Sequence, residues 1–383
     1  MNDILSNAIA NIDAQEDSML QFWRELILLE SPSHYKEGVD RVGTLLSRYC
    51  SKQLGYHIRF QQDEVYGNCL AACSCPFESF ENGIVLSSHM DTVHAVGTFD
   101  PVIREDGSYI YGPGAGDCKA GVVMSLMVAK ALKTIGYSAR PIKLLFAADE
   151  ESGGPTGRTF YPNELRGADY MFNCESGIAG KLVTGRKSSL ITVFKIRGEA
   201  AHIGYITAPP KSAIREAALK LLHLEDHSDY DRMTFSGGVI HGGTVATSSP
   251  EECELQVNVR IKDASVINEV LDLLKTTAET AFVAGTTCSL EIRGNINPMS
   301  ERPENIQLCN WMSQESEKLG FGKLESAFVG GASDASYASA MQIPVVCASG
   351  PIVEKQHTRD ERAYIPSLTE RAKIHVATIL NHL

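Results

Sequence analysis

The stretch GIVLSSHMDTVH, residues 83–94, decides how the fold of this chain is interpreted. Its apolar first part predicts a buried strand, and the polar part that follows places His89 and Asp91 where this strand ends. Such a strand can end at a metal ion or in an ordinary loop, and one His-x-Asp unit does not distinguish the two. The other strands of the chain have to decide between these interpretations.

Composition narrows the class of protein before any motif is considered. The chain has 383 residues, is 43% hydrophobic and carries a net charge of −12. Its length predicts two domains, and its acidity makes it a poor candidate for nucleic-acid binding. The sequence contains no apolar run of transmembrane length, and its N-terminus lacks the pattern of a signal peptide. We therefore expect a cytoplasmic protein, with no nucleic acid and no membrane among its partners, whose ten cysteines are reduced.

Strands alternate with helices in the two outer parts of the chain. This alternation predicts an α/β fold with helices packed on a sheet. We expect strands at 57–60, 67–72, 84–88, 142–151, 170–175 and 344–349, and helices in the first fifty residues and at 120–135 and 333–341.

The middle of the chain follows a different order. Between residues 185 and 293 the predicted elements run strand, helix, strand, strand, helix, strand, with the second helix at 264–284. This is the order of a ferredoxin-like α+β domain. We therefore predict a main domain of residues 1–184 plus 294–383, interrupted by an inserted domain of residues 185–293.

Polar side chains with metal-binding chemistry follow the predicted strands of the main domain. In an open α/β sheet, ligands bind beyond the carboxyl ends of the strands, so side chains in these places are expected to meet. Histidines and carboxylates are ligands that Zn²⁺ accepts. The candidates are His89, Asp91, Asp117, Glu150, Glu151, Glu175 and His357.

Each candidate taken singly also has a structural explanation, such as a turn, a cap or an exposed loop. Their shared position at strand ends makes that explanation weak for the set. Cys69, Cys73 and Cys75 form a second possible metal site, for soft metals, although a buried strand with small apolar residues explains them better.

Several motifs extend this pattern over nearly the whole chain. In order they are SSHMDTV, YGPGAGDCKAG, ADEESGG, NCESG, GEAAHIG, NVRI, GGASDASY and QHTRDE. With this order and spacing the chain resembles the di-zinc aminoacylase/glutamate-carboxypeptidase family of metallopeptidases, clan MH, and most of all its bacterial glutamate carboxypeptidase branch. The resemblance implies a zinc-peptidase-like mixed sheet flanked by helices, and it implies that the inserted domain is a dimerisation, or lid, domain.

The resemblance also implies a site with two zinc ions per subunit, although Co²⁺ or Mn²⁺ also suit such ligands. Asp91 would orient the imidazole of His89, and Glu150 would be the general base. A cis peptide bond is implied between Asp117 and Cys118. The implied ligands are His89, Asp117 and Glu175 for one ion and Asp117, Glu151 and His357 for the other, with Asp117 bridging.

Substrate-binding residues are implied mainly in the inserted domain. His202 would stabilise the oxyanion in the active site of the partner subunit of a homodimer, and Arg260 would bind a substrate carboxylate. Gly331 and Ser333 would line the pocket. Thr247 stands where the family usually has Asn, so recognition of the carboxylate is expected to differ.

The expected reaction is metal-assisted hydrolysis of the amide bond of a peptide or an N-acyl amino acid, carboxypeptidase-like in its recognition of a free carboxylate. Three alternatives remain open: a deacylase of the acetylornithine or succinyl-diaminopimelate type, an aminopeptidase, and a non-catalytic metal-binding assembly protein. The presence of Glu150 argues against the last of these.

Overall fold

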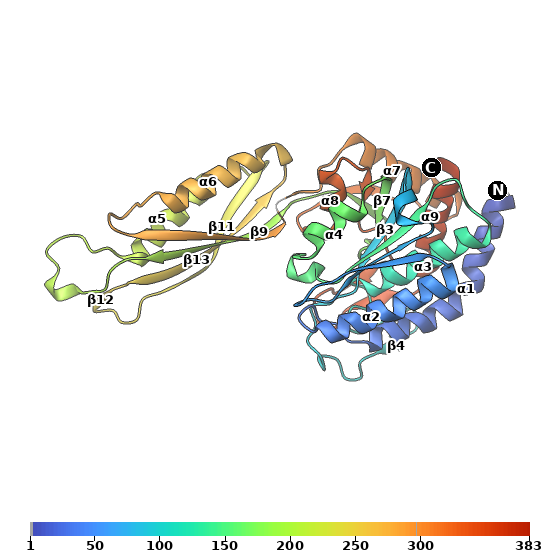
Figure 1. Cartoon of the computed structure of the whole chain (residues 1–383), viewed down its shortest axis with the longest axis horizontal. Helices are drawn as coiled ribbons and strands as arrows, with labels where there is room; N and C mark the ends of the chain where they lie inside the picture. Colours follow the sequence, from blue (N-terminus) through green and yellow to red (C-terminus); the bar gives the residue numbers. More distant parts are fainter. Residues whose placement is uncertain (1–2, 296) are drawn as a thin grey trace. The chain divides into compact units, whose positions relative to one another are not determined.

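The computed structural model describes residues 3–295 and 297–383. The chain forms two compact units, whose elements are labelled in Figure 1. Unit 1 contains the residues up to Gly185, together with Glu301–Val329 and Ser333–Leu383. Unit 2 contains Arg186–Ser300 and the short segment Gly330–Ala332.

Unit 1 is built on a six-stranded mixed sheet in the order β1-β2-β6-β3-β7-β16. Strands β6, β3, β7 and β16 are parallel to one another, whereas β1 and β2 are antiparallel to their neighbours. The strands are β1 (His57–Gln61), β2 (Cys69–Cys73), β3 (Gly83–His89), β6 (Ile142–Ala147), β7 (Ala168–Asn173) and β16 (Val345–Val346).

Helices pack on this sheet, and two small sheets complete the unit. Helix α3 is buried along nearly its whole length because it packs against α1, α9 and β3. The helices are α1 (Asp3–Leu28), α2 (Lys36–Tyr49), α3 (Lys119–Thr134), α4 (Gly157–Glu164), α7 (Pro303–Lys318), α8 (Ala335–Ala340) and α9 (Ser367–His382). The small sheets pair β4 (Arg104–Asp106), β5 (Tyr109–Tyr111), β18 (Arg362–Tyr364) and β17 (Val353–Glu354), and separately β8 (Lys181–Arg186) with β15 (Glu325–Val329).

Unit 2 is a four-stranded antiparallel sheet with two helices. The strand order is β11-β13-β9-β14, and α5 (Ala213–Glu225) and α6 (Ile267–Glu279) pack on one face. The strands are β9 (Ser189–Arg197), β11 (Met233–Gly242), β13 (Glu252–Ile261) and β14 (Thr287–Asn295), with a short pair, β10 (Ala201–His202) and β12 (Ser248–Ser249), beside them. Strand β13 alternates buried apolar with partly exposed polar residues, as expected for a sheet covered on one face.

The fold class predicted from the sequence is confirmed, with a mixed sheet flanked by helices and an inserted βαββαβ unit. Several predicted boundaries differ from those observed, among them the strand predicted at 344–349, of which only Val345–Val346 forms, and two further differences are informative. The strand predicted at 142–151 ends at Ala147, and Glu150 begins a short 3-10 helix, because the Asp91 carboxylate accepts the backbone N–H groups of Glu150 and Glu151 and turns the chain out of the sheet. The helix predicted at 264–284 ends at Glu279, where Thr280 is extended.

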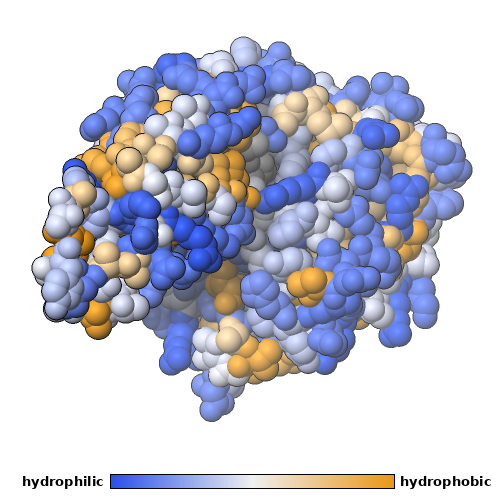
Figure 2. All heavy atoms as spheres, turned by 60° about the vertical axis from the view of Figure 1, so that its left-hand side comes forward, coloured by the Kyte–Doolittle hydropathy of each residue, from blue (hydrophilic) through white to orange (hydrophobic). Residues whose placement is uncertain are grey.

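Two surface properties follow from the described residues. No helix among them is both long enough and apolar enough to cross a membrane. On the face drawn in Figure 2, apolar side chains occur in small groups among hydrophilic ones.

A buried histidine makes the stability of unit 1 depend on pH. His375 on α9 lies against the ring of Phe172, donates from Nδ1 to the Arg371 carbonyl oxygen and has its Nε2 3.1 Å from the Ser349 hydroxyl oxygen. Burial lowers the pKa of His375 to about 4. In the unfolded chain the same imidazole has a pKa of 6.5, the ordinary value for histidine. Burying the neutral imidazole therefore costs no stability above pH 6.5, and the unfolding free energy falls as the pH drops from 6.5 to about 4.

We expect His375 to account for about 2 kcal/mol of the unfolding free energy lost between pH 7 and pH 5. Urea unfolding of chelator-treated protein at both pH values tests this prediction. His375→Gln should remove that part of the pH dependence, whereas the exposed control His57→Gln should keep it. An equal loss in all three proteins would contradict the assignment.

Candidate metal centre

Three adjacent parallel strands bring the candidate residues together. Strand β3 ends at His89, and β6 and β7 on either side of it end just before Glu150 and Glu175. Because the carboxyl ends of parallel strands share one edge of the sheet, residues that are 86 positions apart in the sequence meet there.

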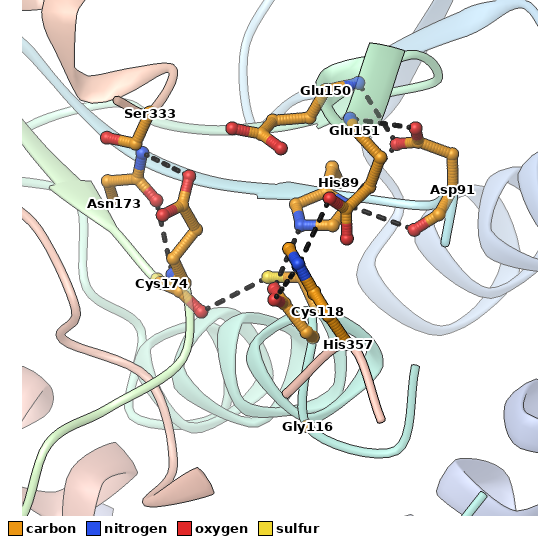
Figure 3. A network of polar contacts seen from close by, with 12 residues as sticks. His89, Asp91, Gly116, Cys118, Glu150, Glu151, Asn173, Cys174, Ser333 and His357 are labelled. Atoms are coloured by element: carbon orange, nitrogen blue, oxygen red, sulfur yellow. Dashed lines mark hydrogen bonds and ion pairs between the residues drawn. The ribbon is translucent and has the colours of Figure 1, made fainter. Parts of the chain in front are cut away.

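Asp117 lies between the imidazoles of His89 and His357, which are labelled in Figure 3. Its Oδ1 is 3.2 Å from Nε2 of His89, and its Oδ2 is 3.3 Å from Nε2 of His357. His357 Nε2 is also 3.3 Å from Oε2 of Glu151. His89, Asp117 and Glu151 can each offer one ligand atom, and these three atoms lie within 4.8 Å of one another. The geometry is that of a carboxylate able to share its two oxygens between two neighbouring positions.

The residues present fit divalent cations. Oε1 of Glu151 is buried and has no hydrogen-bond partner among the described residues, which leaves a negative oxygen uncompensated. Hydrogen bonds that the His357 imidazole donates to Asp117 and to Glu151 raise the pKa of His357 to about 10. Burial by itself would raise the pKa of Asp117, but the imidazoles of His357 and His89 hold it below its usual range. The carboxylates thus draw protons onto the histidines, and cations can take the place of those protons.

Asp91 connects His89 with the segment that carries Glu150 and Glu151. Its Oδ1 is 3.2 Å from Nδ1 of His89, whose Nδ1 is also 3.0 Å from the Asp91 carbonyl oxygen. The same carboxylate accepts the backbone N–H groups of Glu150 and Glu151 and the hydroxyl of Ser33. Asp91 therefore orients one imidazole and fixes the segment that carries both glutamates, which is how partners of metal ligands commonly act.

Glu150 and Glu151 point in different directions although they are consecutive. Figure 3 shows Glu151 extending toward His357, while the Glu150 carboxylate extends toward the side where Ser333 and Asn173 lie. Burial, followed by the charge of Glu175, raises the pKa of Glu150 well above its usual value. A carboxylate with a raised pKa is a better proton acceptor than a solvent-exposed one, as a general base requires.

The loop before α3 presents Asp117. A cis peptide bond joins Asp117 to Cys118, as the family resemblance implies. The indole Nε1 of Trp23 on α1 donates to the Ala115 carbonyl oxygen at 2.9 Å and holds the middle of the loop. A Cβ on Gly121 would lie 1.7 Å from the Cys174 carbonyl oxygen, so only glycine lets α3 approach the segment that carries Glu175.

Sequence reasoning missed Glu361, which lies in the quoted motif QHTRDE. Its buried carboxylate accepts the backbone N–H groups of Gly116 and Asp117 at 3.1 Å through Oε1, and Oε2 lies 2.8 Å from Nε2 of His94. Glu361 therefore connects the loop of Asp117 with the loop of His357. Its position four residues after His357 was the only signal available.

Glu175 and Ser333 each have a polar partner within unit 1. Asn173 Nδ2 donates to Oε1 of Glu175 at 3.4 Å, and the Ser333 hydroxyl is 3.3 Å from the Cys347 sulfur. Glu175 is absent from the cluster of His89, Asp117 and Glu151 defined by the 4.8 Å limit. Asp334, another residue that sequence reasoning missed, is buried here too, and burial and Glu175 raise its pKa.

The other residues predicted to bind substrate belong to unit 2. His202 pairs with Ser248 in the short β10–β12 sheet, and the Thr247 carbonyl oxygen accepts the N–H of Ile203, so His202 and Thr247 are neighbours. Arg260 on β13 donates to Oδ1 of Asn258 and to the carbonyl oxygen of Gly330. Gly331 lies in the same short segment as Gly330, and its carbonyl oxygen accepts from Arg186.

Cys69, Cys73 and Cys75 do not form a metal cluster among the described residues. Strand β2 is buried throughout, as expected for small apolar residues, and all ten cysteines are free thiols. The Sγ atoms of Cys73 and Cys75 are 3.7 Å apart.

Comparison with known families shows to which family the chain belongs. The family profile described as "Peptidase family M20/M25/M40" matches residues 85–381, which is most of the chain. The chain belongs to the M20 peptidase family. This is a metallopeptidase family whose members depend on metal ions, usually zinc.

Curated relatives of this M20 chain are named as probable carboxypeptidases. The one from Arthroderma gypseum is 26% identical over 289 residues, which are 68% of this chain and 61% of that protein. The one from Aspergillus terreus is 28% identical over 299 residues, 71% of this chain and 68% of that protein. The chain thus matches about three fifths of the length of the first of these relatives.

Solved structures share the fold of this M20 chain. Aminopeptidase PepT from Bacillus cereus has a TM-score of 0.76 at 21% identity, covering 95% of this chain and 98% of that one. An M20 family metallo-carboxypeptidase from Sulfolobus solfataricus has a TM-score of 0.75 at 15% identity, covering 94% and 98%. A tripeptidase from Staphylococcus aureus has a TM-score of 0.74 at 24% identity, covering 95% and 97%.

The role of Glu361 gives a testable prediction for metal binding. Glu361→Ala removes the acceptor of two buried N–H groups, at a cost of about 1–3 kcal/mol each, and releases the loop of Asp117. We expect zinc affinity to fall about 10- to 100-fold in a competition titration with a chromophoric chelator. Glu361→Gln keeps one carbonyl oxygen as acceptor and should lose less.

The matched control is Glu105→Gln, since Glu105 is exposed and pairs with Arg24 at the protein surface. Its zinc affinity should equal that of the wild type. If Glu361→Ala lowers the unfolding free energy of the chelated protein but binds zinc as the wild type does, Glu361 supports the fold and not the centre.

Proposed function

We propose that the protein is a metal-dependent hydrolase that cleaves the amide bond of peptides or N-acyl amino acids with a free carboxylate, in the manner of a carboxypeptidase. The observation that carries this proposal is the position of Asp117 between His89 and His357, with the Glu150 carboxylate beside them. Membership of the M20 family and the names of the relatives support it.

Two zinc ions are the proposed metals. His89, Asp117 and Glu175 would hold one ion, and Asp117, Glu151 and His357 the other, with one oxygen of Asp117 for each. The mixture of imidazoles and carboxylates suits Zn²⁺ and also accepts Co²⁺ or Mn²⁺. When bound, such ions supply an acidified water molecule and polarise the scissile carbonyl.

Glu150 is the proposed general base and acid. Its carboxylate takes a proton from the attacking water and delivers it to the nitrogen of the leaving amine. Asp91 keeps His89 oriented during both steps and holds the backbone of Glu150 in place. The exclusion of water by burial around Glu150 strengthens these electrostatic effects.

Substrate recognition is assigned to residues of both units. His202 would stabilise the oxyanion, and Arg260 would bind the substrate carboxylate with its planar guanidinium group. Gly331 and Ser333 would line the pocket. Thr247 has no amide to offer, so we do not extend the proposal to glutamate as the preferred residue.

Other hydrolytic substrates are the second candidate. An aminopeptidase is one alternative, since the fold is similar to those of an aminopeptidase and a tripeptidase. A deacylase of the acetylornithine or succinyl-diaminopimelate type is another, since it uses the same chemistry. Outside hydrolysis, a metal-binding assembly protein would retain the ligands but would have no use for Glu150.

A homodimer that forms through unit 2 is part of the proposal, with His202 acting across the interface. Strand β11 is an edge of its sheet, and Val239 and Ile240 on it and Leu222 on the adjacent α5 are about half exposed. Unpaired strand edges with apolar neighbours favour pairing with a second copy. A chain that sediments as a monomer at micromolar concentration and is fully active would contradict this.

We also place the protein in the cytoplasm, which the ten free thiols support.

The adjacent glutamates give the sharpest test of the mechanism. Glu150→Gln should lower kcat by about 10²- to 10⁴-fold on a panel of dipeptides and N-acyl amino acids, while the zinc content stays that of the wild type. Glu151→Gln, one residue away, should lose zinc as well as activity. Metal analysis after dialysis and steady-state kinetics measure both effects.

Undiminished turnover by Glu150→Gln would remove Glu150 from the mechanism. No turnover by the zinc-loaded wild type across the whole panel would favour the non-catalytic alternative.

A further inference from the structure

A pocket of about 470 Å³ opens beside the candidate metal centre within unit 1. It shares the ligand Glu151 with the centre, so a substrate bound at the centre can extend directly into it. Its volume lies in the range of small-molecule sites. The segment 32–35 forms one wall, residues of the segment 92–96 form the other, and Glu151 and Ser152 also line the pocket.

Backbone hydrogen bonds fix the two walls of this pocket. The N–H of Ser33 donates to the Thr92 carbonyl oxygen at 3.2 Å, and the N–H of Thr92 donates to the Ser31 carbonyl oxygen at 2.9 Å. Further along, the N–H of Gly97 donates to the Glu30 carboxylate at 2.8 Å. The walls are therefore formed before any ligand binds, which reduces the entropy that binding has to overcome.

The lining combines apolar side chains with hydroxyl groups and the imidazole of His34. Val93 is 42% and Val96 57% exposed, so the side chains of both have apolar surface to bury. Ser33 already donates its hydroxyl to Asp91. Among the lining residues there is no Lys or Arg, and Glu151 belongs to the metal centre. The valines suit a hydrocarbon group, and with no lysine or arginine to offset the charge of Glu151 the lining disfavours a carboxylate.

The position of Glu150 indicates which half of the substrate enters. In the proposed mechanism Glu150 protonates the leaving amine, and its carboxylate extends toward the side of Ser333 and Asn173 (Figure 3). The acyl substituent of an amide lies on the opposite side of the carbonyl carbon from the nitrogen. It is therefore directed toward Glu151 and Ser152, where the pocket begins.

We propose that this pocket binds the acyl side of the substrate and selects uncharged apolar acyl groups, or apolar N-terminal residues, over short or anionic ones. This inference rests on the proposed amide hydrolysis, because it uses the role of Glu150. It would also separate the protein from a deacylase of succinylated substrates, since a succinyl group would place its carboxylate against the valines and near Glu151.

A series of N-acyl amino acids with one fixed amino acid tests the proposal. From acetyl through butanoyl to hexanoyl, we expect kcat/KM to rise about fourfold for each methylene group that leaves water. Succinyl should be turned over much more slowly than butanoyl, which has the same chain length. Calorimetric binding of the same series to zinc-loaded Glu150→Gln should show the same order of affinities without turnover.

A charge placed in the pocket should reverse the selectivity. In Val96→Arg, kcat/KM for the hexanoyl substrate relative to the acetyl substrate should fall. The kcat/KM for succinyl relative to butanoyl should rise about fivefold, which is the gain expected from a partly exposed ion pair. Val96 is exposed, so this change is not expected to unfold the protein. The matched control is Ile306→Arg, an exposed apolar residue of α7 outside the pocket, which should leave both ratios unchanged.

The outcomes separate this inference from the proposed function. Hydrolysis with no dependence on acyl length, with a preference for succinyl, or with ratios that Val96→Arg does not change would overturn the pocket assignment and leave the hydrolase standing. Affinities that rise with acyl length in the absence of any turnover would support the pocket and count against the hydrolase. If neither binding nor turnover depends on the acyl group, the pocket has no such role.

Discussion

Buried negative charge is the constraint on which the rest of this structure depends. The carboxylates of Asp117, Glu150 and Glu151 meet at one edge of a sheet with those of Glu175 and Asp334, and burial raises the pKa of most of them. Such a group of carboxylates is unfavourable unless cations or protons compensate it. Two imidazoles on opposite oxygens of Asp117 provide part of this compensation, and divalent metal ions would complete it.

Other buried carboxylates hold the candidate ligands in place. Asp91 joins His89 to the segment of Glu150 and Glu151, and Glu361 joins the loop of Asp117 to the loop of His357. Both carboxylates bond to backbone N–H groups, so they determine where the chain runs as well as how a side chain is turned. The candidate ligands are therefore held by a second set of buried acids, and their arrangement exists before a substrate arrives.

The sequence predicted most of the fold because its periodicity is strong. Buried strands such as β3 and β6 are short apolar runs, and the alternation in β13 marks a sheet covered on one face. The end of β6 was missed because the Asp91 carboxylate, which turns the chain there, lies 59 residues earlier in the sequence. Glu361 was missed for a related reason, since its partners are backbone groups that no motif displays. The pocket could not be predicted either, because Val93 and Val96 resemble ordinary loop residues until the Pro32–Tyr35 wall is seen beside them.

The central claim is that Asp117 is shared between two metal ions, and anomalous diffraction from crystals of the zinc-loaded protein tests it most directly. Data collected on both sides of the zinc absorption edge locate the ions independently of any assumed ligand. The account predicts two anomalous peaks about 3.5–4 Å apart, one against each oxygen of Asp117, with His89 at one peak and His357 at the other. A single peak, or peaks that do not contact Asp117, would contradict it.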